Sequence, residues 1–132
     1  MHVLTQAGFV ALGSVLGGLL RWGIGVGVAR WLGTGFPYGT FFINLSSCVF
    51  LGWFMTVLDE RLANGLAWIS RDNLRLMVAV GFTGTYSTFS TFEYDTHELV
   101  RDGASAKAAL YFFGSVFLGL FAVWLGVLLA RR

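Results

Sequence analysis

Residues 81–92, GFTGTYSTFSTF, combine glycines, hydroxyl side chains and two phenylalanines in a stretch that carries no charge. In lipid every backbone polar group needs an internal partner, so helix-breaking sequence at membrane depth is tolerated only where it is buried in protein or lines a cavity. A plain membrane anchor would use leucine and valine here. The segment therefore predicts a place where a membrane protein conducts or binds a solute.

Two further kinds of side chain could handle an anion. Asn44 supplies an amide NH2, and Thr40, one turn earlier on the same helix face, supplies a hydroxyl. Phe89 and Phe92 are three residues apart, so their rings fall on one stripe. Because an aromatic ring has a positive edge, phenyl edges turned toward a pore attract an anion without a fixed charge that would trap it. Ordinary packing of both rings is the alternative.

Hydroxyl groups also follow one face of the last apolar segment. Tyr111, Ser115 and Gly119 form a row at i, i+4 and i+8. Ser90 and Thr91 are further hydroxyl candidates beside the two rings. The competing interpretation is that serine and glycine serve helix packing and that hydroxyls bond their own helix carbonyls.

Arg21 is a charge within an apolar segment. It shares an i, i+4 row with Gly13, Gly17 and Gly25. An intramembrane charge faces protein or water rather than lipid, which makes Arg21 a functional or anchoring residue; snorkelling toward the helix end is the alternative. The GxxxG spacings of these glycines permit close helix approach, within one subunit or in an oligomer.

The elements that position these residues are membrane helices. The chain has 56% hydrophobic and only 12% charged residues, with a mean hydropathy of +0.71, whereas a soluble domain carries about 25% charged residues. The uncharged runs approach the roughly 20 residues that a spanning helix needs. We therefore predict an all-α membrane protein, a single transmembrane domain over 1–132, with helices at 4–29, 38–58, 75–99 and 106–130.

Basic residues in the loops predict the orientation only weakly. Four helices place both termini and the second loop on one side, with five basic residues: Arg61, Arg71, Arg75, Arg131 and Arg132. The other side has three, Arg30, Arg101 and Lys107, or four if Arg21 is counted there. Lysine and arginine near helix ends are retained on the cytoplasmic side. A nearly even distribution between the two sides is therefore typical of a protein that inserts in both orientations. Chance is the alternative.

Taken together, these motifs resemble the Fluc family of small fluoride channels. The likeness covers essentially the whole chain: GFTGTYSTFSTF, Asn44 within GTFFINLSSCVFLG, Arg21 within GGLLRWGIG, and Tyr111 with Ser115. It implies passive fluoride export across the inner (plasma) membrane by an antiparallel, dual-topology homodimer with two pores. It also implies a third helix broken near its middle and a structural sodium ion held by the backbone carbonyls of Gly84 and Ser87.

Three positions depart from the family pattern or leave it open. Ser87 stands where the family often has threonine, which matters little if only its carbonyl binds. Ser47 replaces a usual glycine, which puts the local helix packing in question. Glu93 and Asp95 both compete for the place of the family carboxylate.

Other classes fit less well. A four-helix, dual-topology drug exporter needs a membrane-embedded carboxylate for proton exchange, and the first helix has none. A non-transporting assembly subunit would not require a polar track. An enzyme is not expected, because no intramembrane His, Cys or Asp/Glu cluster suggests a nucleophile or metal site, and Cys48 is a single thiol. Nucleic acid is not an expected partner, since the nine basic residues sit at helix ends.

Overall fold

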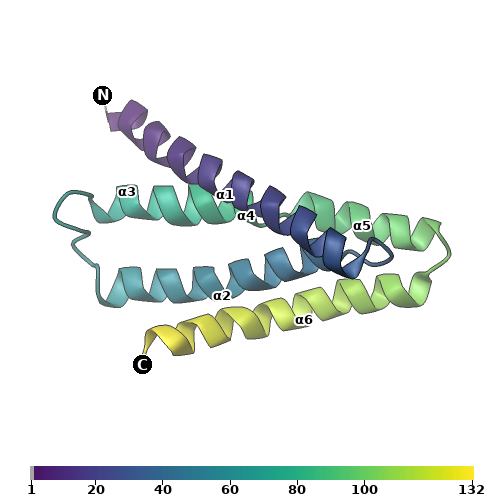
Figure 1. Ribbon diagram of the computed structural model, residues 1–132. Coiled ribbons are helices and arrows are strands. Elements are labelled where there is room, and N and C mark those ends of the chain that lie inside the picture. The colour runs from purple at the N-terminus through teal and green to yellow at the C-terminus, as the bar shows by residue number, and fades with distance from the viewer. Residues whose placement is uncertain (1) are drawn as a thin grey trace.

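The computed structural model describes residues 2–132, which form helices joined by short connections (Figure 1). Within these residues there is no strand, only an isolated bridge between Leu66 and Ile69. The predicted all-helical class is confirmed. The elements in chain order are α1 (His2–Leu32), α2 (Tyr38–Glu60), α3 (Arg71–Arg75), the π-helix η1 (Leu76–Thr83), α4 (Gly84–Tyr86), α5 (Phe89–Arg101) and α6 (Ser105–Ala130).

Three of these helices, α1, α2 and α6, are long and apolar enough to cross a membrane, among the residues described. They coincide with three of the four predicted spans. The remaining predicted span, 75–99, lies within the consecutive shorter helices from α3 to α5. The start of α1, the end of α6 and the α2–α3 connection lie at one end of the bundle, and the α1–α2 and α5–α6 connections lie at the opposite end (Figure 1).

Glycines set the closest helix contacts. Gly52 of α2 faces the backbone of Val123 on α6, and Gly126 of α6 faces the backbone of Val49 on α2. Gly13 and Gly17 of α1 are buried against the backbone of η1 in the same way. Since lipid gives helices no hydrophobic reason to associate, such close backbone packing is what holds them together.

The π-helix η1 is stabilised locally. The hydroxyl of Thr83 donates to the carbonyl of Val78, five residues earlier, at 2.9 Å, which is the spacing of a π turn. Gly81 lets η1 approach the backbone of α1 at Val10 and Gly13. The wide turn and the absent side chain together place this segment directly against α1.

Between α4 and α5 the backbone becomes extended at two residues, Ser87 (φ −76°, ψ 164°) and Thr88 (φ −155°, ψ 117°). The side chain of Thr88 then caps α5 by accepting from the N–H of Thr91 at 3.2 Å. A threonine cap compensates one of the orphan N–H groups of a new helix start. The consequence is a non-helical junction at the middle of the bundle, in view in Figure 1.

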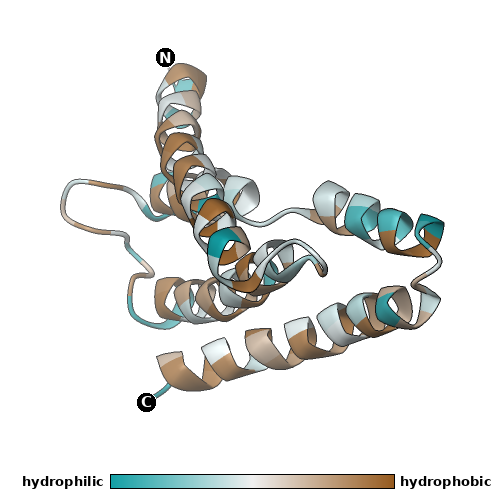
Figure 2. Cartoon of the chain, turned by 45° about the vertical axis from the view of Figure 1, so that its right-hand side comes forward, coloured by the Kyte–Doolittle hydropathy of each residue, from teal (hydrophilic) through white to brown (hydrophobic). Residues whose placement is uncertain are grey.

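The outer faces of α1, α2 and α6 are apolar, whereas hydrophilic residues gather on α5 and at helix ends (Figure 2). Phe117 and Phe121 of α6 are 68% and 55% exposed, so both rings belong to this apolar outer face. The packed apolar core is small and lies at the end of the bundle near the α2–α3 connection, around Phe54, Leu58 and Leu74. An exterior of this kind suits a multi-pass membrane protein, in which lipid covers the apolar surface.

Candidate functional site

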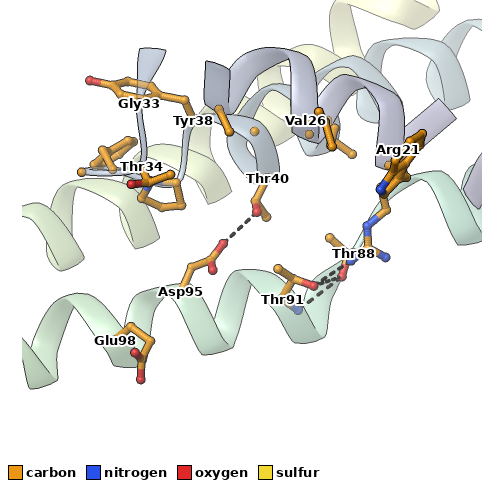
Figure 3. A pocket seen from close by; sticks show the side chains of 18 of the residues that line it. Arg21, Val26, Gly33, Thr34, Tyr38, Thr40, Thr88, Thr91, Asp95 and Glu98 are labelled. Atoms are coloured by element: carbon orange, nitrogen blue, oxygen red, sulfur yellow. Dashed lines mark hydrogen bonds between the residues drawn. The ribbon is translucent and has the colours of Figure 1, made fainter. Parts of the chain in front are cut away.

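A cavity of about 860 Å3 opens between α1, the α1–α2 connection, α2 and α5 (Figure 3). We call it the vestibule. Its polar lining comes from helices far apart in the sequence and includes Arg21, Thr40, Thr88, Thr91 and Asp95. The fold therefore gathers four residues predicted from the sequence, or left open there, into one concave site beside the 87–88 junction.

Arg21 points into this vestibule rather than away from the bundle (Figure 3). Its guanidinium donates to the hydroxyl of Thr91 at 2.7 Å, linking α1 to the first turn of α5. The hydroxyl of Thr88 donates to the same oxygen at 2.9 Å. Of the two interpretations of Arg21, the geometry favours a protein-facing charge over one that snorkels.

Asn44 is bonded to the junction itself. Its amide NH2 donates to the carbonyl of Thr88 at 3.1 Å, and its amide oxygen accepts from the N–H of Thr88 at 2.9 Å. This reciprocal pair replaces both helical hydrogen bonds that an extended residue gives up. Because an amide NH2 has two donors, Asn44 keeps a second N–H for another acceptor.

Thr88 is a residue of this candidate site that the sequence analysis missed. It joins Asn44 through its backbone and Thr91 through its hydroxyl, so it connects α2 with α5. A signal was present, because a threonine directly before a restarting helix is a favoured cap. The motif STFSTF contains several such residues, and only the fold shows which one is the cap.

The structure also separates the two candidate carboxylates. Asp95 accepts from the hydroxyl of Thr40 at 2.7 Å and from the phenol of Tyr111 at 3.4 Å, so it joins α5, α2 and α6. Glu93 is exposed and does not line the vestibule. Asp95 is thus the carboxylate beside the polar side chains predicted for the path.

Phe89 and Phe92 are neighbours but differ in surroundings. Their ring centroids are 6.1 Å apart. Phe92 is only 5% exposed and packs against Tyr111 at 5.1 Å and Phe112 at 5.7 Å. Phe89 is 74% exposed, so in the single chain one ring is enclosed and the other is presented outward.

The predicted hydroxyl row on α6 faces inward in part. Tyr111 is fully buried. Ser115 has a buried Oγ with no hydrogen-bond partner among the described residues, an unusual state that marks a place where a ligand or water is expected. Ser90 is exposed on the first turn of α5 and is not among the residues around the vestibule.

Gly84 and Ser87 meet one requirement of a backbone cation site. In a continuous helix the N–H of Thr88 would bond the carbonyl of Gly84, and that of Thr91 would bond the carbonyl of Ser87. Here Thr88 donates to Asn44 and Thr91 to the side chain of Thr88 instead. Both carbonyls therefore lose their helical donors, and a freed carbonyl oxygen suits a hard cation.

Ser47, where a glycine was expected, fits without a gap in hydrogen bonding. It is buried, and its hydroxyl donates to the carbonyl of Asn44 in its own helix at 2.7 Å. The packing question raised by this residue is thereby answered locally. The same bond ties Ser47 to the helix turn that carries the Asn44 amide.

The fold and the site together define a small multi-pass helical membrane protein with a polar vestibule that ends at an interrupted helix. The particular family follows from comparison with known proteins. Residues 8–127 match the family described as CrcB-like protein, Camphor Resistance (CrcB), and the chain belongs to that family. This match, together with relatives that are named fluoride-specific ion channels, confirms the resemblance expected from the sequence motifs.

Named relatives cover nearly the whole chain. A protein of Acidobacterium capsulatum named fluoride-specific ion channel FluC is 46% identical over 94% of this chain and 94% of its own length. A protein of the same name from a Synechococcus strain is 47% identical over 92% of this chain and 89% of its own length. One from Thermus thermophilus is 46% identical over 89% of this chain and 88% of its own length.

Proposed function

We propose that this protein is a fluoride-specific channel that lets fluoride leave the cytoplasm passively across the inner membrane. The observation that carries the proposal is the set of hydrogen bonds from Arg21 through Thr91 and Thr88 to Asn44, which surrounds the helix junction with donors. The relatives' name supplies the identity of the ion. No enzymatic activity is part of the proposal.

Fluoride is small and strongly hydrated, so a path must replace its water with hydrogen-bond donors. The hydroxyl of Thr91 is arranged to act as such a donor. Its oxygen already accepts from Arg21 and Thr88, which uses the two lone pairs of a hydroxyl and leaves its O–H free to donate. The second N–H of Asn44 is a further donor, on the same amide nitrogen that bonds the carbonyl of Thr88.

The start of α5 adds positive potential. Thr88 caps only the N–H of Thr91, so the first N–H groups of α5, at Phe89 and Ser90, have no helical partner. The positive end of a helix dipole favours an anion. Fluoride entering from the vestibule would thus meet Arg21 first and the amino end of α5 next.

Beyond the junction we place the path between the rings and the hydroxyl row. The edges of Phe89 and Phe92 would face the anion on one side. Tyr111 and Ser115 would provide hydroxyls on the other. Asp95 fixes the positions of Thr40 and Tyr111 by accepting from both hydroxyls.

We further propose an antiparallel homodimer with two pores, a third span broken at Ser87 and Thr88, and both orientations in one membrane. The balanced basic residues at the two ends support it. The outward-facing Phe89 supports it as well, because a second chain would bury a ring that is 74% exposed alone.

Sodium would bind at the centre of this dimer. Two copies would contribute four oxygens, the carbonyls of Gly84 and Ser87 from each. The ion would supply positive charge that holds the two junctions together. The diverted N–H groups of Thr88 and Thr91 are the structural support for this role.

One observation favours a second candidate, a proton-coupled small-molecule exporter. Asp95 is a carboxylate within the bundle, lining the vestibule. A coupled exporter would need such a group to take up and release protons. A channel and an exporter differ in whether a pH gradient drives transport, which makes the two separable in one assay.

The test is fluoride efflux from liposomes that contain the purified protein, followed with a fluoride electrode. Fluoride should leave when a potassium ionophore provides the counter-charge and should do so without a pH gradient. Liposomes loaded with chloride and followed with a chloride electrode should release little chloride when the same potassium ionophore is added. Equal chloride release, or fluoride release that requires a proton gradient, would rule out the proposed function.

A further inference from the structure

A second cavity adjoins the vestibule at Gly35, Phe36 and Tyr38 and lies between α6, the α1–α2 connection and the start of α2. Its volume is about 610 Å3, and we call it the α6 groove. Its walls are mainly apolar, with one basic residue at the end near the start of α6. The residues that matter for the argument are Tyr38, Phe41, Lys107, Leu110, Gly114 and Leu118.

The apolar part of the groove is hollowed at Gly114. Leu110, Gly114 and Leu118 form an i, i+4, i+8 row along α6. A Cβ added at Gly114 would meet no atom within 4 Å, so the chain itself leaves this space open. An open apolar groove of this kind has room for an unbranched hydrocarbon chain.

The polar end of the groove is positively charged. Lys107 lies in the first turn of α6 and is the only lysine of the chain. Among residues 2–132 the ion pairs use arginines, and Lys107 is in none of them. The start of α6 also has no side-chain cap, so its free N–H groups add to the positive end of a long helix.

We propose that the α6 groove binds one anionic membrane phospholipid. The phosphate would pair with Lys107 and the uncapped start of α6, and one acyl chain would run along Leu110, Gly114 and Leu118. From Lys107 to Leu118 the helix rises roughly 16 Å. This is close to half of a hydrocarbon core about 30 Å thick, which is the depth of one leaflet.

A phospholipid satisfies both halves of the groove at once. Its phosphate lies at the headgroup level, where the first turn of α6 and Lys107 are placed if α6 spans the membrane. Its acyl chain lies below, where the open space beside Gly114 is found. A second copy of the chain could cover the apolar row but would have to bring an anion to an unpaired lysine.

Native mass spectrometry of the purified full-length protein tests the proposal, with equimolar phosphatidylglycerol and phosphatidylcholine of identical acyl chains. The wild type should retain phosphatidylglycerol preferentially. Lys107→Gln should weaken its binding about fivefold, the effect of one basic residue near an anionic headgroup. Gly114→Leu should weaken binding of both lipids, because its side chain fills the acyl part of the groove.

Two matched controls lie outside the groove. Arg30→Gln removes a positive charge at the same end of the bundle, and Gly8→Leu adds a side chain to an equally open glycine. Both should bind lipid as the wild type does. Equal retention of the two lipids by the wild type, or unchanged phosphatidylglycerol binding by Lys107→Gln or by folded Gly114→Leu, would overturn the proposal.

A cross-linking arm distinguishes lipid from protein in the groove. Gly114→Cys in a Cys48→Ser background carries one thiol at the centre of the groove. If lipid occupies the groove, oxidation should leave this variant free of disulfide-linked dimers. A disulfide-linked dimer would assign the groove to a second copy of the chain and would contradict the lipid proposal. This result does not depend on whether Gly114→Leu folds.

Discussion

At the scale of single residues, Thr88 and Asn44 hold the junction between α4 and α5. An extended residue inside a bundle exposes a backbone N–H and C=O, and an unpaired buried group costs about 1–3 kcal/mol. The two bonds to Asn44 remove that cost at Thr88. The same amide is a proposed donor to the passing ion, so structure and transport rest on one side chain.

Asn44→Ala should therefore slow fluoride flux about tenfold or more, since it leaves both backbone groups of Thr88 unpaired and removes a donor. The measurement is the efflux rate from liposomes at equal protein density. Thr56→Ala is the control on the same helix, because its hydroxyl bonds only the carbonyl of Gly52 in α2. Wild-type flux from well-folded Asn44→Ala would remove this residue from the mechanism.

The rings give the second prediction at this scale. Phe89→Ile and Phe92→Ile keep an apolar side chain and lose the aromatic quadrupole, so both variants should fold and conduct poorly. Phe89→Ile is the cleaner test, because Phe89 packs little within the chain while Phe92 is enclosed. Flux is measured by efflux and assembly by size-exclusion chromatography.

Phe117→Ile and Phe121→Ile provide the matched controls, since these rings are exposed on the outer face of α6. Their flux should stay near that of the wild type. If Phe89→Ile and Phe92→Ile conduct as well as these controls, the rings are packing residues and not part of the path.

At the scale of elements, the crossing of α1 over η1 depends on missing side chains. A Cβ at Gly17 would overlap the carbonyl oxygen of Phe82 and the hydroxyl of Thr85, so Gly17→Ala forces the helices apart. The expected loss of stability is about 1–3 kcal/mol, the usual cost of overpacking. The midpoint of thermal unfolding in detergent measures it.

Gly23→Ala on the same helix is the comparison, because a Cβ there meets nothing within 4 Å. It should be neutral or slightly stabilising, since alanine is the better helix former. Equal midpoints for the two variants would show that the close approach at Gly17 contributes no stability.

The junction between α4 and α5 yields a prediction about sodium. Within one chain a Cβ at Gly84 would meet only the carbonyl of Ala79 at 4.0 Å, so Gly84→Leu should leave the single-chain fold intact. If two junctions meet around sodium, the variant should lose both sodium-dependent stabilisation and transport. Ser87→Thr should behave as the wild type, because only the carbonyl is used.

Thermal stability of the dimer measured in sodium and in a large organic cation tests this point. The wild type should be more stable in sodium, and Gly84→Leu should show no difference between the two salts. A wild type that is equally stable in both salts, or Gly84→Leu with full transport, would contradict a cation site made of these carbonyls.

At the scale of the whole molecule, basic residues are nearly balanced between the two ends of the bundle. Because lysine and arginine near helix ends set orientation, we expect both orientations in one membrane. A tag at the C-terminus should be accessible from outside in inverted vesicles and also in right-side-out vesicles. Adding three lysines after Arg132 should bias insertion and lower flux by depriving the inverted dimer of one orientation.

A neutral extension of the same length is the control: three glutamines after Arg132 should leave both orientations and flux unchanged. A tag found on one side only in the unmodified protein would exclude the antiparallel dimer, even if fluoride flux remained.

The chain's composition and charge spacing were sufficient to predict the membrane class and the positions of α1, α2 and α6. The reason is physical, since a long uncharged run has one stable solution in lipid, a helix that satisfies its own backbone. The family resemblance could also be predicted, because STFSTF, Asn44 and Arg21 occur in order along the chain.

Only the tertiary structure decided which polar groups meet. Asp95 rather than Glu93 faces Thr40 and Tyr111, Thr88 is the cap and the partner of Asn44, and Arg21 reaches Thr91 across 70 residues of sequence. Residue spacing within a helix gives the face on which a side chain lies. Which face meets which neighbour depends on how whole helices cross. Here close backbone contacts at glycines set the crossings, and the local sequence pattern does not say which helices those glycines bring together.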